Sequence, residues 1–240
     1  MMHPQILRLR VKFRCWCVSS GRVDLSGQVL KSGTTTVGFV GRDFVVLATD
    51  TRATAGFFVA HRKTRKLHKV ADHIALTIAG RVADAQSMID ILRANVRHYE
   101  VTWGRKMEVR ALAALASTFM FTYRYFPFQA QLLLAGVDSS GPHLFSIDFF
   151  GGVTEEKLVA TGSGSPVALG VLESEYRPDL SIDEAVRLAF KSVAAAIRRD
   201  IGSGDSIDVA YISPATMYRE LTREEKAPLY DAYVKPYLLT

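Results

Sequence analysis

Residues 34–56 read TTTVGFVGRDFVVLATDTRATAG, and they carry the strongest indication of the fold. Apolar and β-branched residues fill 34–40 and 43–49, and a glycine separates the two segments. The same strand character returns at 55–60 and 73–79, and glycines again bound the segments. We expect this part of the chain to form paired strands joined by tight turns.

Three later segments have the pattern of helices. Apolar residues recur three or four apart from 85 to 99, and a second segment rich in Ala, Leu and Phe covers 108–125. Ser181 and Glu184 form a capping box at the start of a third helix. Two consecutive helices therefore follow the first strands, and we expect one further helix after Ser181.

Strand character returns after the helix pair and again near the end of the chain. The expected strands are 131–137, 144–149, 158–161 and 207–212. Strands, a helix pair, strands, one helix and strands again indicate an α+β protein with two stacked sheets and helices on their outer faces. No linker divides residues 34–240, so we expect a single domain.

The first 33 residues differ in composition from the rest. They hold six of the 30 basic residues and one of the 24 acidic ones, so 34–240 carries 24 basic and 23 acidic residues, +1 of the net +6. Both cysteines, Cys15 and Cys17, also lie there, and without a second pair we expect reduced thiols rather than a zinc site. Residues 7–18 alternate with the period of a strand, which fits no targeting signal.

The overall composition, 48% hydrophobic and 22% charged, is that of an ordinary globular protein. No segment approaches the roughly 18 apolar residues of a membrane helix. No cluster of His, Cys and acidic residues has metal-binding spacing. The basic run 61–69, HRKTRKLHK, lacks interleaved aromatic residues on which bases could stack. We therefore expect no membrane, metal, cofactor or nucleic acid.

Residues 32–38, SGTTTVG, lie where the basic leader ends and the strand-rich body begins. A threonine run in a strand ordinarily reflects β-propensity alone. Other short motifs follow it in order: DTR at 50–52, RKL at 65–67, TIAG at 77–80, TGSGS at 161–165 and RDIGSGD at 199–205. Together these motifs resemble the proteasome β subunit, most closely the archaeal type, over residues 33–212.

This resemblance implies an N-terminal-nucleophile hydrolase with an αββα sandwich and the activity of a threonine-type endopeptidase. It implies a cytoplasmic 20S core particle in which β subunits form rings next to rings of α subunits. An ATP-dependent unfoldase cap would supply unfolded polypeptides. The leader 1–33 would be a propeptide that is removed by autocatalytic cleavage after Gly33, leaving 34–240 as the catalytic domain.

The family's functional positions carry residues of the expected type in this chain. Thr34 matches the nucleophile, Asp50 and Lys66 match its acid and lysine, and Gly80 matches the backbone donor to the oxyanion. The supporting network matches Ser163, Asp200 and Ser203, and Asp200 is expected to hydrogen-bond the amine and both serine hydroxyls. The substrate-binding positions match Ala53, Thr54, Ile78 and Val82.

These residue types suit the chemistry. A threonine hydroxyl is a poor nucleophile until a base takes its proton, and a freed α-amine with a reference pKa of about 8 can do so. An internal threonine has only an amide, so an uncut chain should be inactive. The Lys66 ammonium would favour the unprotonated amine and stabilise the alkoxide, with Asp50 holding it in place. The N–H of Gly80 would bind the oxyanion.

The pocket residues predict the cleavage preference. Ala53, Ile78 and Val82 are uncharged and apolar, so the pocket should favour Leu, Phe or Tyr before the cut bond. His68 matches a nearby pocket position and would attract an acidic side chain if it were protonated.

Alternative interpretations exist for each residue and for the whole chain. Asp50 could form a turn, Lys66 could belong to a solvated basic run, and Gly80 could simply end a strand. The bacterial ATP-dependent protease HslV also begins with threonines, but the segment 199–205 resembles the proteasome form. A non-catalytic ring subunit would be expected to lose Thr34, Lys66 or the preceding glycine.

Overall fold

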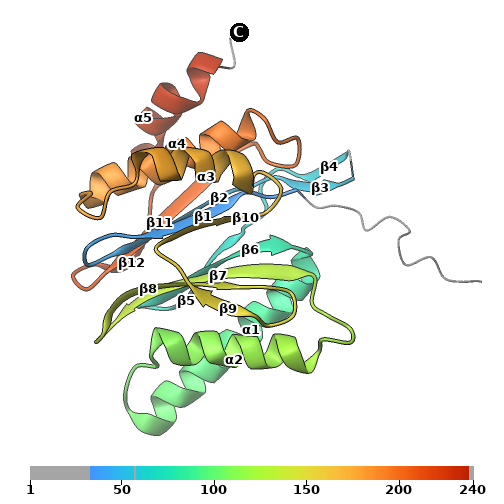
Figure 1. Cartoon of the computed structure of the whole chain (residues 1–240), viewed down its shortest axis with the longest axis vertical. Helices are drawn as coiled ribbons and strands as arrows, with labels where there is room; N and C mark the ends of the chain where they lie inside the picture. The colour runs from blue at the N-terminus through green and yellow to red at the C-terminus, as the bar shows by residue number, and fades with distance from the viewer. Residues whose placement is uncertain (1–32, 57, 238–240) are drawn as a thin grey trace, which may run out of the picture.

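The computed structural model describes residues 33–56 and 58–237. The expectations for the leader before Gly33, including those for Cys15 and Cys17, lie outside the described residues. Within the described part, two five-stranded sheets stack face to face with helices on both outer faces (Figure 1). The predicted α+β sandwich of two antiparallel sheets flanked by helices is confirmed.

The first sheet contains the strand that follows the threonine run. Its order is β10 (Leu158–Thr161), β1 (Thr36–Val40), β2 (Val45–Asp50), β11 (Ile207–Ser213) and β12 (Met217–Glu220). All neighbours are antiparallel, and Thr36 lies opposite Thr161 on one side and Thr49 on the other. Thr34 therefore lies between the end of β2 and the end of β10.

The second sheet is a simple meander of neighbouring strands. Its order is β5 (Leu67–Ala71), β6 (Ile74–Gly80), β7 (Ala130–Asp138), β8 (Gly141–Ile147) and β9 (Val153–Glu155). These strands also pair antiparallel, with Leu67 opposite Thr77 and Gly80 opposite Ala130. The register places the beginning of β5 beside the last residues of β6.

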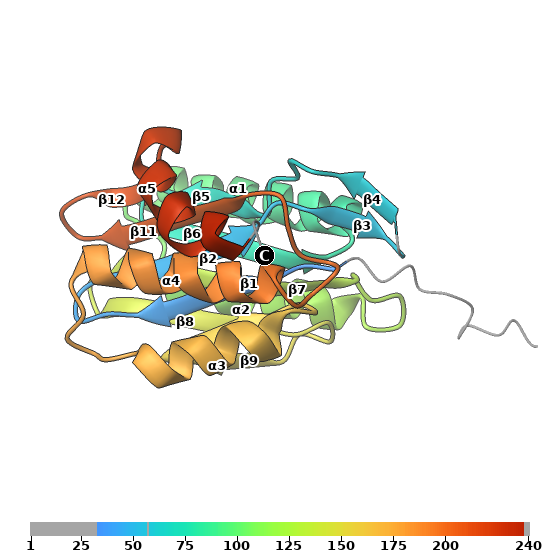
Figure 2. The same cartoon turned by 90° about the horizontal axis from the view of Figure 1, so that it is seen from above.

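Helices cover both outer faces, as Figures 1 and 2 show. The second sheet carries α1 (Val82–Trp103) and α2 (Val109–Thr122), and the first carries α3 (Ser165–Glu175) and α4 (Ile182–Ile197). The chain ends in α5 (Arg223–Tyr233), which contacts α4, and a short 3-10 helix, Lys235–Tyr237. None of the helices described is long and apolar enough to cross a membrane.

The core consists of three apolar layers, one between the sheets and one beneath each helix pair. Strand β2 shows how the sequence builds two of them. Val46 and Ala48 face α4, whereas Val45 and Leu47 face the other sheet. Side chains alternate across a strand, so a strand buried on both faces reads as a continuous apolar run.

Two sequence expectations need correction. The single strand predicted over 55–60 is a hairpin of β3 (Ala53–Ala55) and β4 (Phe58–His61), because Gly56 turns the chain with φ +63°. The hairpin projects beyond the sheets in Figures 1 and 2. One helix, starting after Ser181, was expected between β10 and β11, but the structure has two. The additional helix, α3, precedes Ser181 and has Pro166 in its first turn. The sequence analysis also missed β5, β9, β12 and α5.

Candidate active site

Thr34 lies buried just before β1, with only 2% of its surface exposed. In the uncut chain its N–H donates to Ser163 Oγ at 3.2 Å, and its hydroxyl donates to the carbonyl oxygen of Gly33 at 2.7 Å. The hydroxyl that the sequence singles out is therefore held against the peptide group that precedes it.

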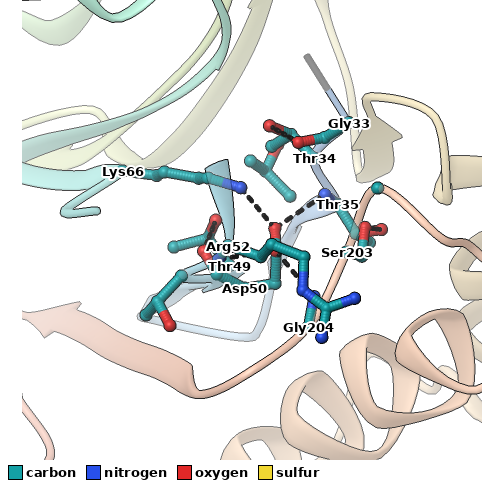
Figure 3. Close-up of polar contacts among 12 residues, drawn as sticks. Gly33, Thr34, Thr35, Thr49, Asp50, Arg52, Lys66, Ser203 and Gly204 are labelled. Atoms are coloured by element: carbon teal, nitrogen blue, oxygen red, sulfur yellow. Dashed lines mark hydrogen bonds and ion pairs between the residues drawn. The ribbon is translucent and has the colours of Figure 1, made fainter. Parts of the chain in front are cut away.

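Asp50 ends β2 and has no exposed surface. Its Oδ1 accepts hydrogen bonds from Lys66 Nζ at 2.8 Å and the N–H of Thr35 at 2.9 Å (Figure 3). Its Oδ2 accepts the N–H groups of Arg52 and Gly204, each at 3.0 Å. Four donors thus converge on one carboxylate, which fixes Lys66 relative to the threonine run.

Lys66 does not belong to the solvated basic run. Only 6% of its side chain is exposed, whereas Arg62, Lys63 and Arg65 are exposed. Burial lowers the pKa of Lys66 and raises the pKa of Asp50, and the attraction between the two charges opposes both shifts. A protonated Asp50 would direct a proton at one of its four donors, so the geometry requires the ionised carboxylate.

A second network joins the threonine run to the loop between α4 and β11. The hydroxyls of Ser163 and Ser203 each donate to Asp200 Oδ2 at 2.6 Å, as the sequence predicted. Each serine has one proton, so each must accept its other hydrogen bond, from the N–H of Thr34 and from the Thr35 hydroxyl, respectively. Thr34 nitrogen therefore reaches Asp200 through Ser163, where the sequence suggested a direct contact.

The sequence analysis did not predict that Arg52 holds the same loop between α4 and β11 through an ion pair and a hydrogen bond. Arg52 donates from Nε to Asp205 Oδ2 at 2.9 Å and from its guanidinium to the carbonyl of Ile201 at 3.1 Å. Asp205 has φ +67°, a left-handed conformation that asparagine and aspartate tolerate better than most residues. The arginine of the DTR motif was the available signal, because it lies only two residues after Asp50.

Gly80 ends β6 in a conformation that requires glycine. Its φ is +138°, and a Cβ there would lie 2.1 Å from the carbonyl oxygen of Gln129. On the same strand, Ile78 donates its N–H to the carbonyl of Lys66 at 3.1 Å. N–H groups two residues apart on a strand point to the same side, so the N–H of Gly80 points toward the side where β5 begins.

A cavity of about 280 Å³ brings these groups together. Its lining includes Thr34, Lys66 and Gly80, and also the predicted pocket residues Ala53, Ile78 and Val82. The sequence analysis missed other members of the lining: Lys63, Thr64, Arg65, Ala85 and Gln86. A larger cavity of about 760 Å³, along α1 and β5, contains none of the predicted site residues.

Thr54, the fourth predicted substrate-binding residue, is not part of this lining. It lies on β3 opposite Val59, and its hydroxyl accepts the N–H of Gly33 at 2.8 Å. In the uncut chain its side chain therefore contacts the residue before Thr34.

His68 lines the cavity as an uncharged side chain. Its pKa is lowered to about 4, mainly by burial and also by the nearby Arg93 and Arg65 guanidinium groups. Its Nε2 lies 3.0 Å from the carbonyl oxygen of Arg65, which can only accept, so that nitrogen carries the proton. Near neutral pH this histidine supplies no positive charge to the pocket.

The described residues contain no group of three His, Cys, Asp or Glu side chains arranged to hold a metal ion. What the site offers is a buried hydroxyl, a buried ammonium with its carboxylate and backbone N–H groups around one cavity. These are the components of nucleophilic acyl transfer.

A four-layer αββα sandwich with a threonine just before strand β1 is the fold of the N-terminal-nucleophile hydrolases. The chain belongs to the proteasome subunit family, whose family model matches residues 30–212. The resemblance found in the sequence is thereby confirmed.

Individual relatives agree with this assignment. The chain is 51% identical over 194 residues to proteasome subunit beta 2 of Hyperthermus butylicus, covering 81% of this chain and 91% of the relative. It is 52% identical over 197 residues to proteasome subunit beta 2 of Staphylothermus marinus, covering 82% and 95%. It is 47% identical over 194 residues to the proteasome subunit beta of Archaeoglobus profundus, covering 80% and 90%.

Proposed function

We propose that this β subunit of a 20S core particle is a threonine endopeptidase whose nucleophile is Thr34. The observation that carries the proposal is one cavity that Thr34, Lys66 and Gly80 line together. The four hydrogen bonds to Asp50 support it further, because they fix the carboxylate that holds the Lys66 ammonium in place. Family membership alone would not carry this proposal, since ring subunits can be inactive.

The free amine of a cut chain would be the base. After cleavage, the nitrogen of Thr34 becomes an α-amine with a reference pKa of about 8 beside Ser163 Oγ. A buried ammonium nearby disfavours a second positive charge on that amine, so Lys66 would keep it unprotonated. The amine would then take the proton of the Thr34 hydroxyl as the oxygen attacks a peptide carbonyl.

Gly80 would stabilise the tetrahedral intermediate. Its N–H points to the β5 side of β6, where β5 begins only at Leu67, opposite Thr77. A backbone donor fixed in a buried cavity stabilises a developing oxyanion more strongly than water does, because it needs no reorganisation.

The same hydroxyl would remove the leader. Thr34 Oγ attacks the carbonyl carbon of Gly33, the Gly33–Thr34 C–N bond breaks, and the nitrogen takes up the hydroxyl proton. The resulting ester is hydrolysed by water, which leaves a carboxylate on Gly33 and restores the hydroxyl of Thr34. The 2.7 Å contact between this hydroxyl and the Gly33 carbonyl supports the step.

The expected partners follow from the family. The subunit would form rings with other β subunits and stack on rings of α subunits, in the cytoplasm. An ATP-dependent unfoldase cap would deliver unfolded polypeptides. A non-catalytic ring subunit is the alternative, and the buried Asp50–Lys66 pair argues against it, because burying two charges is costly without a function.

An intact-mass measurement on Thr34 variants tests the proposal. The wild-type chain in assembled particles should begin at Thr34 and hydrolyse peptides. Thr34→Ala should keep residues 1–33 and be inactive, whereas Thr34→Ser, which keeps a hydroxyl, should process and turn over more slowly. A Thr34→Ala chain that lost its leader, with other proteases excluded, or that hydrolysed peptides would contradict the proposal.

A further inference from the structure

Gly33, the last residue of the leader, is packed against the backbone of Gly202. A Cβ added to Gly33 would lie 2.0 Å from Gly202 Cα, and one added to Gly202 would lie 2.3 Å from Gly33 Cα. Glycine is therefore needed at 33 because the backbone of Gly202 leaves no room for a side chain there.

Both polar groups of Gly33 are also held. Its N–H donates to Thr54 Oγ1 at 2.8 Å, and its carbonyl oxygen accepts the Thr34 hydroxyl at 2.7 Å. Thr54 comes from the β3–β4 hairpin, and Gly202 comes from the loop between α4 and β11. The residue that precedes the scissile bond is thus fixed from two separate elements. Figure 3 shows this residue next to Thr34.

We propose that Thr54 and Gly202 form a clamp that positions Gly33 for self-cleavage and that peptide hydrolysis does not need the Gly202 half of this clamp. The proposal rests on the self-cleavage proposed above. Thr54 is a positioning residue here: its hydroxyl holds the peptide plane of Gly33 while Thr34 attacks the carbonyl carbon. Gly202 provides the space without which Gly33 could not reach that position.

The clamp is separate from the substrate pocket. The 280 Å³ cavity that would receive the side chain before a cut bond is lined by neither Gly33, Thr54 nor Gly202. Once the leader has gone, both Gly33 atoms near a Cβ at position 202 are gone as well. Of the three atoms nearest to that Cβ, Ser163 Oγ at 3.1 Å remains, and a hydroxyl can shift by a few tenths of an ångström.

The first experiment follows leader loss by intact mass in full-length Gly202→Ala, with Gly170→Ala as the matched control. Gly170 lies on α3 with no atom within 4 Å of an added Cβ, so the control should process like wild type. Gly202→Ala should lose its leader at least about a hundredfold more slowly, because the backbones must separate. Turnover per processed chain should stay within about threefold of wild type.

The second experiment tests the hydroxyl of Thr54. Thr54→Val has the same shape but cannot accept the N–H of Gly33, so leader loss should slow by about tenfold or more. Thr54→Ser restores the acceptor and should recover most of the rate, a rescue that a purely structural role for the β-branched side chain would not give.

The outcomes separate this proposal from the function on which it rests. If Thr34→Ala also loses its leader, self-cleavage is wrong and the clamp falls with it. If Thr34→Ala keeps the leader while Gly202→Ala and Thr54→Val process at the wild-type rate, the clamp is wrong and self-cleavage stands. A Gly202→Ala chain whose turnover falls as much as its processing would also overturn the proposed separation of the two reactions.

Discussion

The ammonium of Lys66 donates a hydrogen bond from Nζ to Asp50 Oδ1 at 2.8 Å. Only 6% of the lysine side chain and none of the aspartate side chain is exposed. A buried ion pair of this kind gives little net stability, because desolvation offsets the attraction. The same Asp50 oxygen accepts the N–H of Thr35, which directly follows the proposed nucleophile. The pair therefore fixes one positive charge in the cavity that Thr34 also lines.

Replacing that charge should stop catalysis. Lys66→Ala, in chains expressed with Thr34 already at the N-terminus, should lower peptide turnover by more than tenfold, at least about 1.4 kcal/mol of barrier. Lys63→Ala is the control, because Lys63 lines the same cavity but is exposed. Turnover should be measured per assembled chain, with the melting temperature recorded. Near-normal turnover of an assembled Lys66→Ala chain would contradict the proposed role.

Gly80 should tolerate no side chain. Gly80→Ala would bring a Cβ to 2.1 Å from the carbonyl oxygen of Gln129, which forces the backbone to move and displaces the proposed oxyanion donor. We expect turnover to fall by about a hundredfold or more, as when one such donor is removed.

Gly104→Ala provides the control for Gly80→Ala. Gly104 also has a positive φ, +63°, but no atom lies within 4 Å of an added Cβ. This variant should lose some stability and keep its turnover. Equal turnover losses in the two variants would indicate a general effect of backbone strain rather than a lost donor.

The helices and sheets differ in how well the sequence predicts them. The α4 helix has a complete capping box at Ser181 and Glu184, and its start was predicted correctly. The α3 helix begins at Ser165, the last residue of TGSGS, whose glycines favour a loop, so local propensity concealed it. The α5 helix also has a capping box, at Thr222 and Glu225, but that signal was not used.

The site could be located from the sequence, but its electrostatics could not. Lys66 sits in a run of polar and basic residues, and only the three-dimensional pairing with Asp50 makes it a buried cation. Burial also lowers the pKa of His68, and one of the arginines that lowers it further, Arg93, lies on α1, far from His68 in the sequence. Such effects depend on tertiary contacts that no short motif contains.

The cavity should favour cleavage after large apolar residues. Ala53, Ile78 and Val82 offer no fixed counter-charge, and the Arg65 guanidinium is paired with Glu220 at 2.7 Å. A leucyl or aromatic side chain gains from burial there, whereas a charged one is desolvated. Fluorogenic peptides that differ only in this residue should be cut faster after Leu, Phe or Tyr than after Glu or Arg. The reverse order on leader-free particles would refute the assignment of this cavity.

The preference should not change with pH near neutrality. Because burial holds the pKa of His68 at about 4, below its ordinary 6.5, the ring stays neutral until the pH falls toward 4. The ratio of cleavage after Glu to cleavage after Leu should therefore stay constant between about pH 6 and 8. A glutamate substrate remains ionised over that range, since its reference pKa is about 4.3.

Titration of the Thr34 amine affects both substrates alike and cancels in the ratio. His68→Lys introduces a permanent cation and should raise the ratio of cleavage after Glu to cleavage after Leu. This positive control tests whether the assay can detect a charge at position 68. A ratio that rose severalfold in the wild type as the pH fell from 8 to 6 would mean that His68 becomes protonated there, contrary to its buried position.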